Sequence, residues 1–263
     1  MELSEAIGRR RSTRFLLPHK PVERHKIQRM LEAARLASHW GNASTLRAVV
    51  VFRDEAPDEV IETLASPVAG YQARLAPVLI VWFLDTAAVD EQHDRLRELV
   101  DAGVLGYGPD RRRALEEVLI PVFSKETLEH LKQPGLNEMD CGQGIAQATL
   151  VAFAQGLATC LLGTANPERI RKGLGMPESC RFLVTQTVGY PAESPEAGGQ
   201  RPRRPFEELF HLNAYGNAFP RDPAVVEDLR REGMIQDPAP LPWREEELEV
   251  LTRGLGLDGN GIL

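Results

Sequence analysis

The sequence predicts a globular protein in which helices and β-strands share one core, followed by a C-terminal extension. The chain has 263 residues, of which 43% are hydrophobic and 26% are charged, a balance that suits a sizeable core. A long and almost uncharged central segment indicates a buried helix, and short apolar runs indicate strands. Because the composition does not shift before about residue 212, we expect one main domain, residues 1–211, and an extension, residues 212–263.

The central helix is expected over residues 140–156, a run rich in Ala and Gly that carries no charge after Asp140. Asp140 can cap its first turn, and Gly156 can supply the left-handed residue that ends it. Its small side chains would let another backbone or a flat ligand approach closely. Residues 157–163 follow as a short buried strand.

Apolar patterns predict the other elements. Residues 47–52, 77–83 and 181–188 are expected as strands, with 77–83 at the centre of the sheet. The helix before the first strand has an inward stripe at helical spacing, formed by Ile27, Met30, Leu31, Ala34 and Ala37. A short helix is expected to begin at Pro167.

Residues 85–137 are charged and helical in pattern, which indicates a helical lid or insert. Its expected inward positions are Leu96, Val100, Leu115, Val118 and Leu119.

Charge and composition exclude several classes of protein. The net charge of -7 argues against a nucleic-acid binder driven by bulk electrostatics. The first residues lack a signal-peptide hydrophobic region, and no apolar run approaches the ~20 residues that span a bilayer, so we expect a cytoplasmic protein. Cys141, Cys160 and Cys180 have no CxxC spacing and are expected as buried free thiols, with no metal site.

Positive charge is concentrated in two short segments. Residues 9–14 hold four arginines beside a serine and a threonine, and residues 201–204 hold three more arginines. Guanidinium forks and hydroxyl donors suit a phosphate group. The alternative from composition alone is that each segment is a solvated basic run.

A loop of small and polar residues, 38–45, follows the helix that carries the inward stripe. It contains one large aromatic residue, Trp40, and one histidine, His39. His39 is a candidate acid or ligand, although a lone histidine in a loop is more often neither.

Several motifs, taken in order, resemble the nitroreductase family of FMN flavoproteins. They are residues 6–14, the Asn42-bearing loop, the strand after Ala76-Pro77, the Asp140-x-Gly142 pair, and residues 156–160, 189–193 and 203–205. The resemblance covers roughly residues 3–215 and is weak across 85–137. It implies an α+β fold with a mixed, largely antiparallel sheet surrounded by helices. It also implies an intertwined homodimer, with the central helix at the interface and the extension wrapped around the partner.

The resemblance further implies that FMN is held between the subunits by residues from both ends of the domain. Arg10, Arg11, Ser12 and Arg14 would hold phosphate and ribityl oxygens, and Arg201 and Arg203 would reach the phosphate or the ring edge. Ser38, His39 and Trp40 would contact the flavin bound mainly by the other subunit, and Asn42 would make a polar contact. Gln72 would place an amide on the cofactor, and backbone groups of Leu162 and Gly163 would meet the ring nitrogens.

One segment departs from the family pattern. Family members commonly continue Asn-x-Gln-Pro-Trp, whereas this chain has Asn42-Ala43-Ser44-Thr45-Leu46. The departure alters the expected substrate pocket and leaves the phosphate site intact. Trp40 stacks near the flavin or fills an interface, and the sequence favours neither.

The implied activity is ping-pong hydride transfer from NADH or NADPH through FMN to a small electron-poor acceptor, such as a nitroaromatic, a quinone or an enone. No side chain need act as a general base, because the flavin carries the chemistry. Three alternatives stay open: an FMN-dependent oxidase or dehydrogenase, a flavin-binding protein without turnover, and a dimer that binds another anionic ligand and no flavin.

Overall fold

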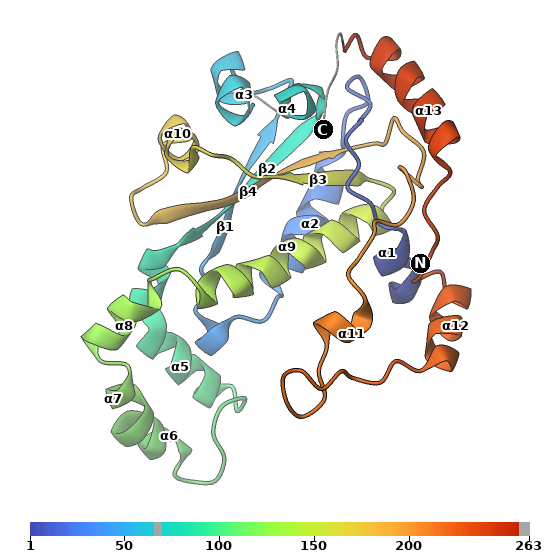
Figure 1. The fold of residues 1–263 in the computed structure, drawn as a ribbon. Coiled ribbons are helices and arrows are strands. Elements are labelled where there is room, and N and C mark those ends of the chain that lie inside the picture. The colour runs from blue at the N-terminus through green and yellow to red at the C-terminus, as the bar shows by residue number, and fades with distance from the viewer. Residues whose placement is uncertain (66–69, 258–263) are drawn as a thin grey trace.

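The fold is α+β, as expected, and is centred on one antiparallel sheet (Figure 1). The structure, a computed structural model, describes residues 1–65 and 70–257. The sheet consists of β1 (Leu46–Phe52), β2 (Val78–Asp85), β3 (Ala158–Leu162) and β4 (Cys180–Gly189), in the order β1-β2-β4-β3. All three neighbouring pairs are antiparallel, so the expectation of a largely antiparallel sheet is confirmed.

The central strand β2 explains the layered arrangement. Successive side chains of a strand point to opposite faces, and both faces of β2 are covered, which is why its sequence is an unbroken apolar run. Val78, Ile80 and Trp82 pack against α2 (Arg24–Arg35) and α9 (Leu136–Ala154). Leu79, Val81 and Phe83 pack on the opposite face, which is covered by α3 (Asp58–Leu64), α4 (Gly70–Leu75) and α10 (Pro167–Gly173).

The central helix α9 packs closely on α2 and the sheet. A Cβ on Gly144 would lie 3.0 Å from the carbonyl oxygen of Ala34 in α2, so a larger side chain would separate the two helices. Gln186 of β4 accepts a hydrogen bond from Trp82 Nε1 (2.9 Å) and donates one to Thr149 of α9 (2.9 Å). This buried polar chain joins the helix to the sheet.

The sequence predicts the end of α9 correctly but not its start. Gly156 follows the helix with φ +76°, which confirms the expected stop. The expected cap at Asp140 is wrong, because α9 begins at Leu136 and contains Asp140. Glu138 instead accepts a hydrogen bond from the backbone N–H of Gly135 (2.7 Å). Glu138, which precedes Asp140, therefore belongs to the helix.

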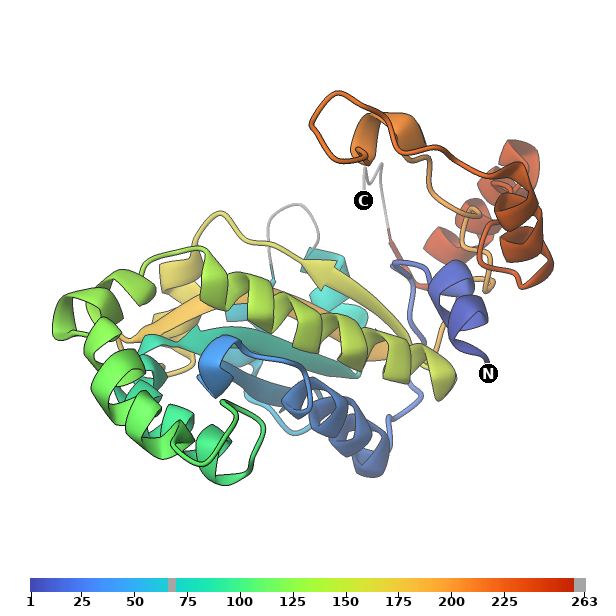
Figure 2. The same ribbon diagram turned by 90° about the horizontal axis from the view of Figure 1, so that it is seen from below.

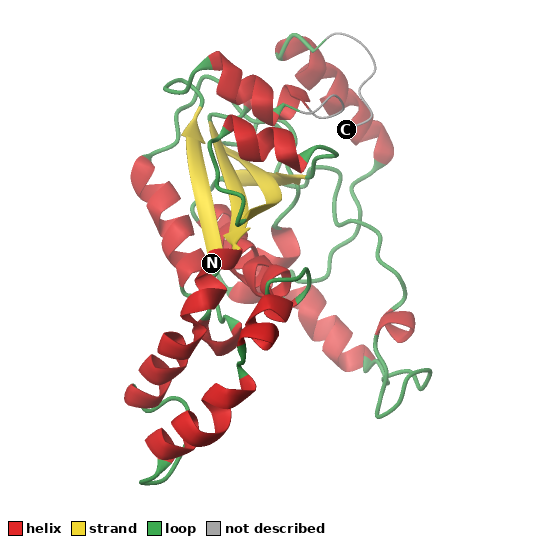
Figure 3. Cartoon of the chain, turned by 90° about the vertical axis from the view of Figure 1, so that its left-hand side faces the viewer, coloured by secondary structure: helices red, strands yellow, loops and turns green. Residues whose placement is uncertain are grey.

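Residues 86–131 form the helical insert at one end of the sheet (Figure 3). Its elements are η2 (Thr86–Glu91), α5 (Gln92–Asp101), α6 (Arg111–Ala114), η3 (Leu115–Leu119), α7 (Ile120–Val122) and α8 (Lys125–Leu131). Leu96, Val100, Leu115 and Phe123 form its small core. Val118 was expected inward but is 67% exposed, because η3 is wound as a π-helix, which changes the spacing of the inward face.

At the opposite end of α9, the N-terminal helix lies beside helices of the C-terminal segment (Figure 2). The N-terminal helix is α1 (Leu3–Arg9), and the C-terminal segment carries α11 (Phe206–Leu209), α12 (Pro223–Arg231) and α13 (Leu241–Gly254). The last six residues of the expected extension, 258–263, lie outside the described residues. Among the described helices, none combines the length and hydropathy needed to cross a bilayer. Cys141, Cys160 and Cys180 are buried free thiols, as expected.

Candidate functional site

The first arginine segment runs in an extended conformation beside the edge strand β3. The backbone N–H of Thr13 donates to the carbonyl oxygen of Thr159 (3.0 Å), and Ser12 forms a parallel bridge with the same residue. Burial alternates along the segment: Arg11 and Thr13 are buried, whereas Arg10, Ser12 and Arg14 are half-buried. An extended backbone has this period of two, and it leaves the half-buried residues open to a ligand.

The second arginine segment meets the first one in space. Burial lowers the pKa of Arg10, and the charge of Arg203 lowers it further. Burial likewise lowers the pKa of Arg201, and Arg14 is the largest charge contribution in the same direction. Like charges perturb each other in this way only when they lie close together. The two arginine segments therefore lie near each other in the fold.

These cations lack carboxylate partners. None of the ion pairs among the described residues involves Arg10, Arg14, Arg201 or Arg203. Their recorded hydrogen bonds go to nearby carbonyl oxygens, such as that from Arg14 Nη1 to Ser12 (3.2 Å) and that from Arg201 Nη1 to Gly199 (3.0 Å). Gathered guanidinium groups without counter-charge are suited to a multiply charged anion.

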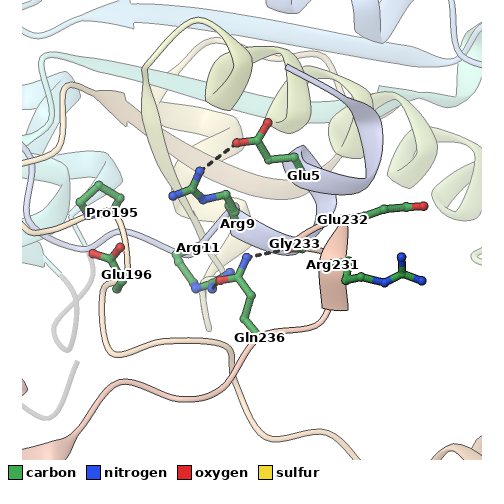
Figure 4. Close-up of a pocket in the computed structure, with 9 residues that line it drawn as sticks. All are labelled: Glu5, Arg9, Arg11, Pro195, Glu196, Arg231, Glu232, Gly233 and Gln236. Carbon is green, nitrogen blue, oxygen red and sulfur yellow. Dashed lines mark hydrogen bonds and ion pairs between the residues drawn. The ribbon is translucent and has the colours of Figure 1, made fainter. Parts of the chain in front are cut away.

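Arg11 lies differently from its neighbours. Its guanidinium donates to the carbonyl oxygens of Gly8 (2.5 Å) and Arg10 (3.1 Å), and to Oε1 of Gln236 (2.8 Å). It lines a cavity of about 420 Å³. The other lining residues come from α1, from the 195–196 loop and from the C-terminal segment (Figure 4): Glu5, Arg9, Pro195, Glu196, Arg231, Glu232, Gly233 and Gln236. The Nε of Arg11 is buried and has no hydrogen-bond partner among the described residues. The structure thus directs Arg11 toward the C-terminal segment.

Gln72 lies in α4. It is buried, and its Oε1 has no hydrogen-bond partner within the described part of the chain. The ring of Tyr71, the residue before it, lies 5.9 Å from the ring of Phe15, measured between centroids. Leu162 ends β3, the same strand that Ser12 bridges, and Gly163 follows it; both are at least partly exposed.

An apolar cavity of about 300 Å³ adjoins the first arginine segment. Its lining includes Arg10 and Thr13 from that segment, Thr159 from β3 and Phe153 from the last turn of α9. The arginines therefore lie at the C-terminal end of α9.

The loop that contains Ser38, His39, Trp40 and Asn42 lies at the other end of α9. The backbone N–H of Trp40 donates to Oδ2 of Asp140 (2.6 Å). At 1.5 Å per residue, α9 rises about 20 Å between positions 140 and 153. Within one chain, these four residues are thus not brought together with the arginines.

Contacts with the insert hold this loop in an unusual conformation. Gly41, Asn42 and Ser44 have φ values of +52°, +58° and +49°, in the left-handed region that non-glycine residues seldom adopt. Gln92 of α5 donates to the carbonyl oxygen of Gly41 (2.6 Å), and the ring of Trp40 packs edge-on against Phe123 (5.3 Å between centroids). Surrounding contacts of this kind are needed to maintain such backbone strain.

His39 is half-buried in the same loop, and its Nδ1 has no hydrogen-bond partner among the described residues. Burial lowers its pKa, which the charge of Asp140 partly opposes. A neutral ring is therefore favoured near pH 7. Among the described residues, no group of three or more His, Cys, Asp and Glu side chains could hold a metal ion.

Sequence reasoning missed one residue pair at the arginine end, Glu193 and Arg244. The buried carboxylate of Glu193 accepts hydrogen bonds from the backbone N–H groups of Arg14 and Phe15 and from the guanidinium of Arg244. Glu193 ends one of the motifs that carry the family resemblance, which was a usable signal. Arg244 lies in a charged helix with no pattern to single it out.

Comparison with known proteins identifies the family. The sequence profile described as the nitroreductase family matches residues 7–190. The chain therefore belongs to the nitroreductase family. A NADH dehydrogenase of Thermus thermophilus is 28% identical over 176 residues, which cover 66% of this chain and 79% of that protein.

Solved structures share the fold at low sequence identity. A protein from Exiguobacterium sibiricum, assigned as a nitroreductase and crystallised in complex with FMN, aligns with a TM-score of 0.63 at 22% identity, covering 81% of this chain and 98% of that chain. A protein from Staphylococcus epidermidis, assigned as an NAD(P)H:FMN oxidoreductase, aligns with a TM-score of 0.64 at 17% identity, covering 80% and 95%. The family fold expected from the sequence is thereby confirmed.

Proposed function

We propose that the chain is an FMN-dependent oxidoreductase that uses NADH or NADPH to reduce small electron-poor acceptors, such as nitroaromatics or quinones. The observation that carries this proposal is the meeting of Arg10, Arg14, Arg201 and Arg203 without carboxylate partners. A dianionic phosphate would supply the missing counter-charge. The unpartnered Oε1 of Gln72 is an acceptor suited to a ribityl hydroxyl or a ring N–H group.

The residues of the chain would bind and orient the cofactor. Arg10, Arg14, Arg201 and Arg203 would hold the phosphate, and Ser12 would hold a ribityl oxygen. Backbone groups of residues 162–163, at the exposed end of β3, would hydrogen-bond to the ring edge. FMN supplies reversible hydride acceptance at its N5 atom when bound. Positive charge near the ring stabilises the anionic reduced form, which favours hydride acceptance.

We also propose that the enzyme is a homodimer and that its two substrates use the same site in turn. The exposed face of α9 carries no charge, since it consists of Met139, Gly142, Gln143, Ala146, Gln147 and Ala154. A partner packed on this face would bring its own loop 38–42 toward the arginine end of the first chain. This would supply the contacts that one chain alone does not bring together.

The test begins with the visible spectrum of the purified protein. Bound FMN is expected to give a yellow protein with the oxidised-flavin absorption band at about 450 nm. This band should bleach with NADH or NADPH and recover when a quinone or nitroaromatic is added. Sedimentation should show a dimer. A colourless protein that takes up no added FMN would contradict the proposal and favour binding of another anion.

A second candidate is an oxidase or dehydrogenase on the same fold. The observation that favours it is the altered loop at Gly41, Asn42 and Ser44, whose left-handed backbone would reshape the acceptor pocket. Peroxide formation in air that is fast relative to quinone reduction would support it. If the reduced protein reoxidises slowly in air and rapidly with a quinone, the reductase proposal holds. A flavin bound without turnover would be seen as no bleaching with either nicotinamide.

A further inference from the structure

The carboxylate of Glu193 fixes the backbone of the first arginine segment. Its Oε1 accepts hydrogen bonds from the backbone N–H groups of Arg14 (2.6 Å) and Phe15 (3.1 Å). The side chain is 1% exposed, so water cannot substitute for these partners. Hydrogen bonds to a buried carboxylate are among the stronger polar contacts in proteins. The position of Arg14 at the candidate FMN site therefore depends on Glu193.

The other oxygen of this carboxylate is held by the C-terminal helix α13. Arg244 donates to Oε2 of Glu193 (2.6 Å) and to Oε2 of Glu247 (2.5 Å), and Glu247 accepts a hydrogen bond from the backbone N–H of Ser194 (2.5 Å). Two adjacent loop residues, Glu193 and Ser194, are thus joined to one turn of α13. We call these contacts of Glu193 and Ser194 with Arg244 and Glu247 the clasp. The clasp lies within one chain, so this part of the extension packs on its own domain.

The chain is packed tightly around the clasp. A Cβ on Gly199 would lie 2.1 Å from the backbone nitrogen of Ala239, and one on Gly8 would lie 2.1 Å from the carbonyl oxygen of Gly233. Gln200 also donates to the carbonyl oxygen of Met234 (2.9 Å) and accepts from the backbone N–H of Gln236 (3.0 Å). Residues 233–239 therefore pack against the residues that directly precede both arginine segments.

The charge of Glu193 gives Arg244 a specific role. Glu193 lies close enough to Arg201 for its charge to act on that guanidinium. Without Arg244, Oε2 of Glu193 would be a buried anion that lacks a cationic partner, and Arg14 or Arg201 could turn to pair with it. If either Arg14 or Arg201 turned toward Glu193, the phosphate site would lose a positive charge.

We propose that Arg244 is a positioning residue of the FMN phosphate site, which occupies the charge of Glu193 and so leaves Arg14 and Arg201 available to the phosphate. The inference rests on the proposed function. It assigns a role to the C-terminal extension, which lies beyond the residues that match the family.

The experiment compares the dissociation constants of FMN and riboflavin, which lacks the phosphate, for the full-length protein. In Arg244→Met, FMN affinity is expected to fall about tenfold or more, because a charge-assisted contact to the phosphate is lost, while riboflavin affinity changes by less than about threefold. The double variant Glu193→Gln/Arg244→Met removes the unpaired anion and should recover most of the FMN affinity. Arg253→Ala, an exposed arginine on the same helix, is the control and should match the wild type.

The outcomes separate this inference from the function on which it rests. Equal loss of FMN and riboflavin affinity, or no recovery in the double variant, would show that Arg244 only supports the fold. Unchanged FMN affinity would overturn the inference as well. If Arg244→Met does not fold, Arg244→Gln keeps a donor for Glu193 and should show the same selective loss of FMN. Failure of the wild type to bind FMN would instead refute the proposed function.

Discussion

The two ends of α9 differ in how their polar side chains are paired. At the N-terminal end, polar groups find partners inside the chain: Asp140 accepts from Trp40, Gln92 donates to Gly41, and Glu138 is paired with Arg181. At the C-terminal end, guanidinium groups from residues 10–14 and 201–203 gather without carboxylate partners among the described residues. We call the first end the satisfied end, because most of its polar groups have partners within the chain, although Nδ1 of His39 and Oε1 of Gln92 do not. The cations of the second end suit an anion from outside the chain.

This difference separates positions that support the fold from positions that bind a ligand. Replacing a residue at the satisfied end leaves a buried group without its partner, which lowers the free energy of unfolding. Replacing an arginine at the other end removes a like charge from a crowded set, which costs little stability but lowers anion affinity. Substitutions at the first end should therefore lower stability, whereas substitutions at the second end should lower ligand affinity.

The largest expected effect is loss of FMN affinity in Arg10→Ala and Arg14→Ala. Each change removes a charge-assisted contact to the phosphate, which is worth about 2 kcal/mol, or roughly 30-fold in the dissociation constant. Fluorescence titration with FMN measures this effect. Arg24→Ala, which removes an exposed arginine on α2 that pairs with Glu55, is the matched control and should bind FMN as the wild type does. Unchanged FMN affinity in both site variants would remove the phosphate role of this segment.

A smaller effect is expected at the satisfied end in Asp140→Ala. The backbone N–H of Trp40 loses its acceptor, so the free energy of unfolding should fall by about 1.5 kcal/mol. Urea denaturation measures the change, with Asp94→Ala as the control, because Asp94 belongs to an exposed ion pair with Arg97. If both variants are equally stable, the hydrogen bond from Trp40 to Asp140 does not fix the loop.

Trp40 tests whether the loop at the satisfied end acts within its own chain. Its ring packs on Phe123, and Trp40→Phe retains an aromatic contact, so the expected loss of stability is about 1 kcal/mol. FMN affinity should change by less than about threefold if Trp40 fills space beside the insert. A larger loss of affinity would show that the Trp40 ring contacts the flavin of a partner subunit.

Much of the fold could be predicted from the sequence, because local patterns carried it. The unbroken apolar run at 77–83 indicated a strand covered on both faces, and β2 is that strand. The start of α9 could not be located, since Leu136 and Glu138 follow a charged stretch that resembles the insert. Val118 was placed inward because helical spacing assumes an α-helix, whereas η3 is wound as a π-helix.

The candidate site was only partly accessible from sequence, for a physical reason. Both arginine segments are visible as local concentrations of charge, and motif order suggested that they serve one ligand. The pairing of Glu193 with Arg244 depends on how the C-terminal extension folds back, and nothing local specifies that contact. The direction of Arg11 toward Gln236 depends on the same packing.

The smallest expected effect is a pH dependence of stability that arises from His39. Burial lowers its pKa in the folded protein below the value of about 6.5 for an unfolded chain. Between those two values the unfolded chain binds more protons, so acidification through this range lowers the free energy of unfolding. His39→Gln should remove this contribution, which is under about 1 kcal/mol for a half-buried ring.

Urea denaturation of the wild type and His39→Gln at pH 7.5 and pH 5.0 (roughly one unit or more on each side of the unfolded value) measures the difference. His19→Gln, which replaces an exposed histidine, is the control and should retain the dependence of the wild type. A loss of stability on acidification that is the same in all three proteins would place the titrating groups elsewhere. A steeper loss in His39→Gln would mean that protonated His39 is stabilised in the folded state by Asp140, which opposes the effect of burial. The satisfied end of α9 would then itself respond to charge.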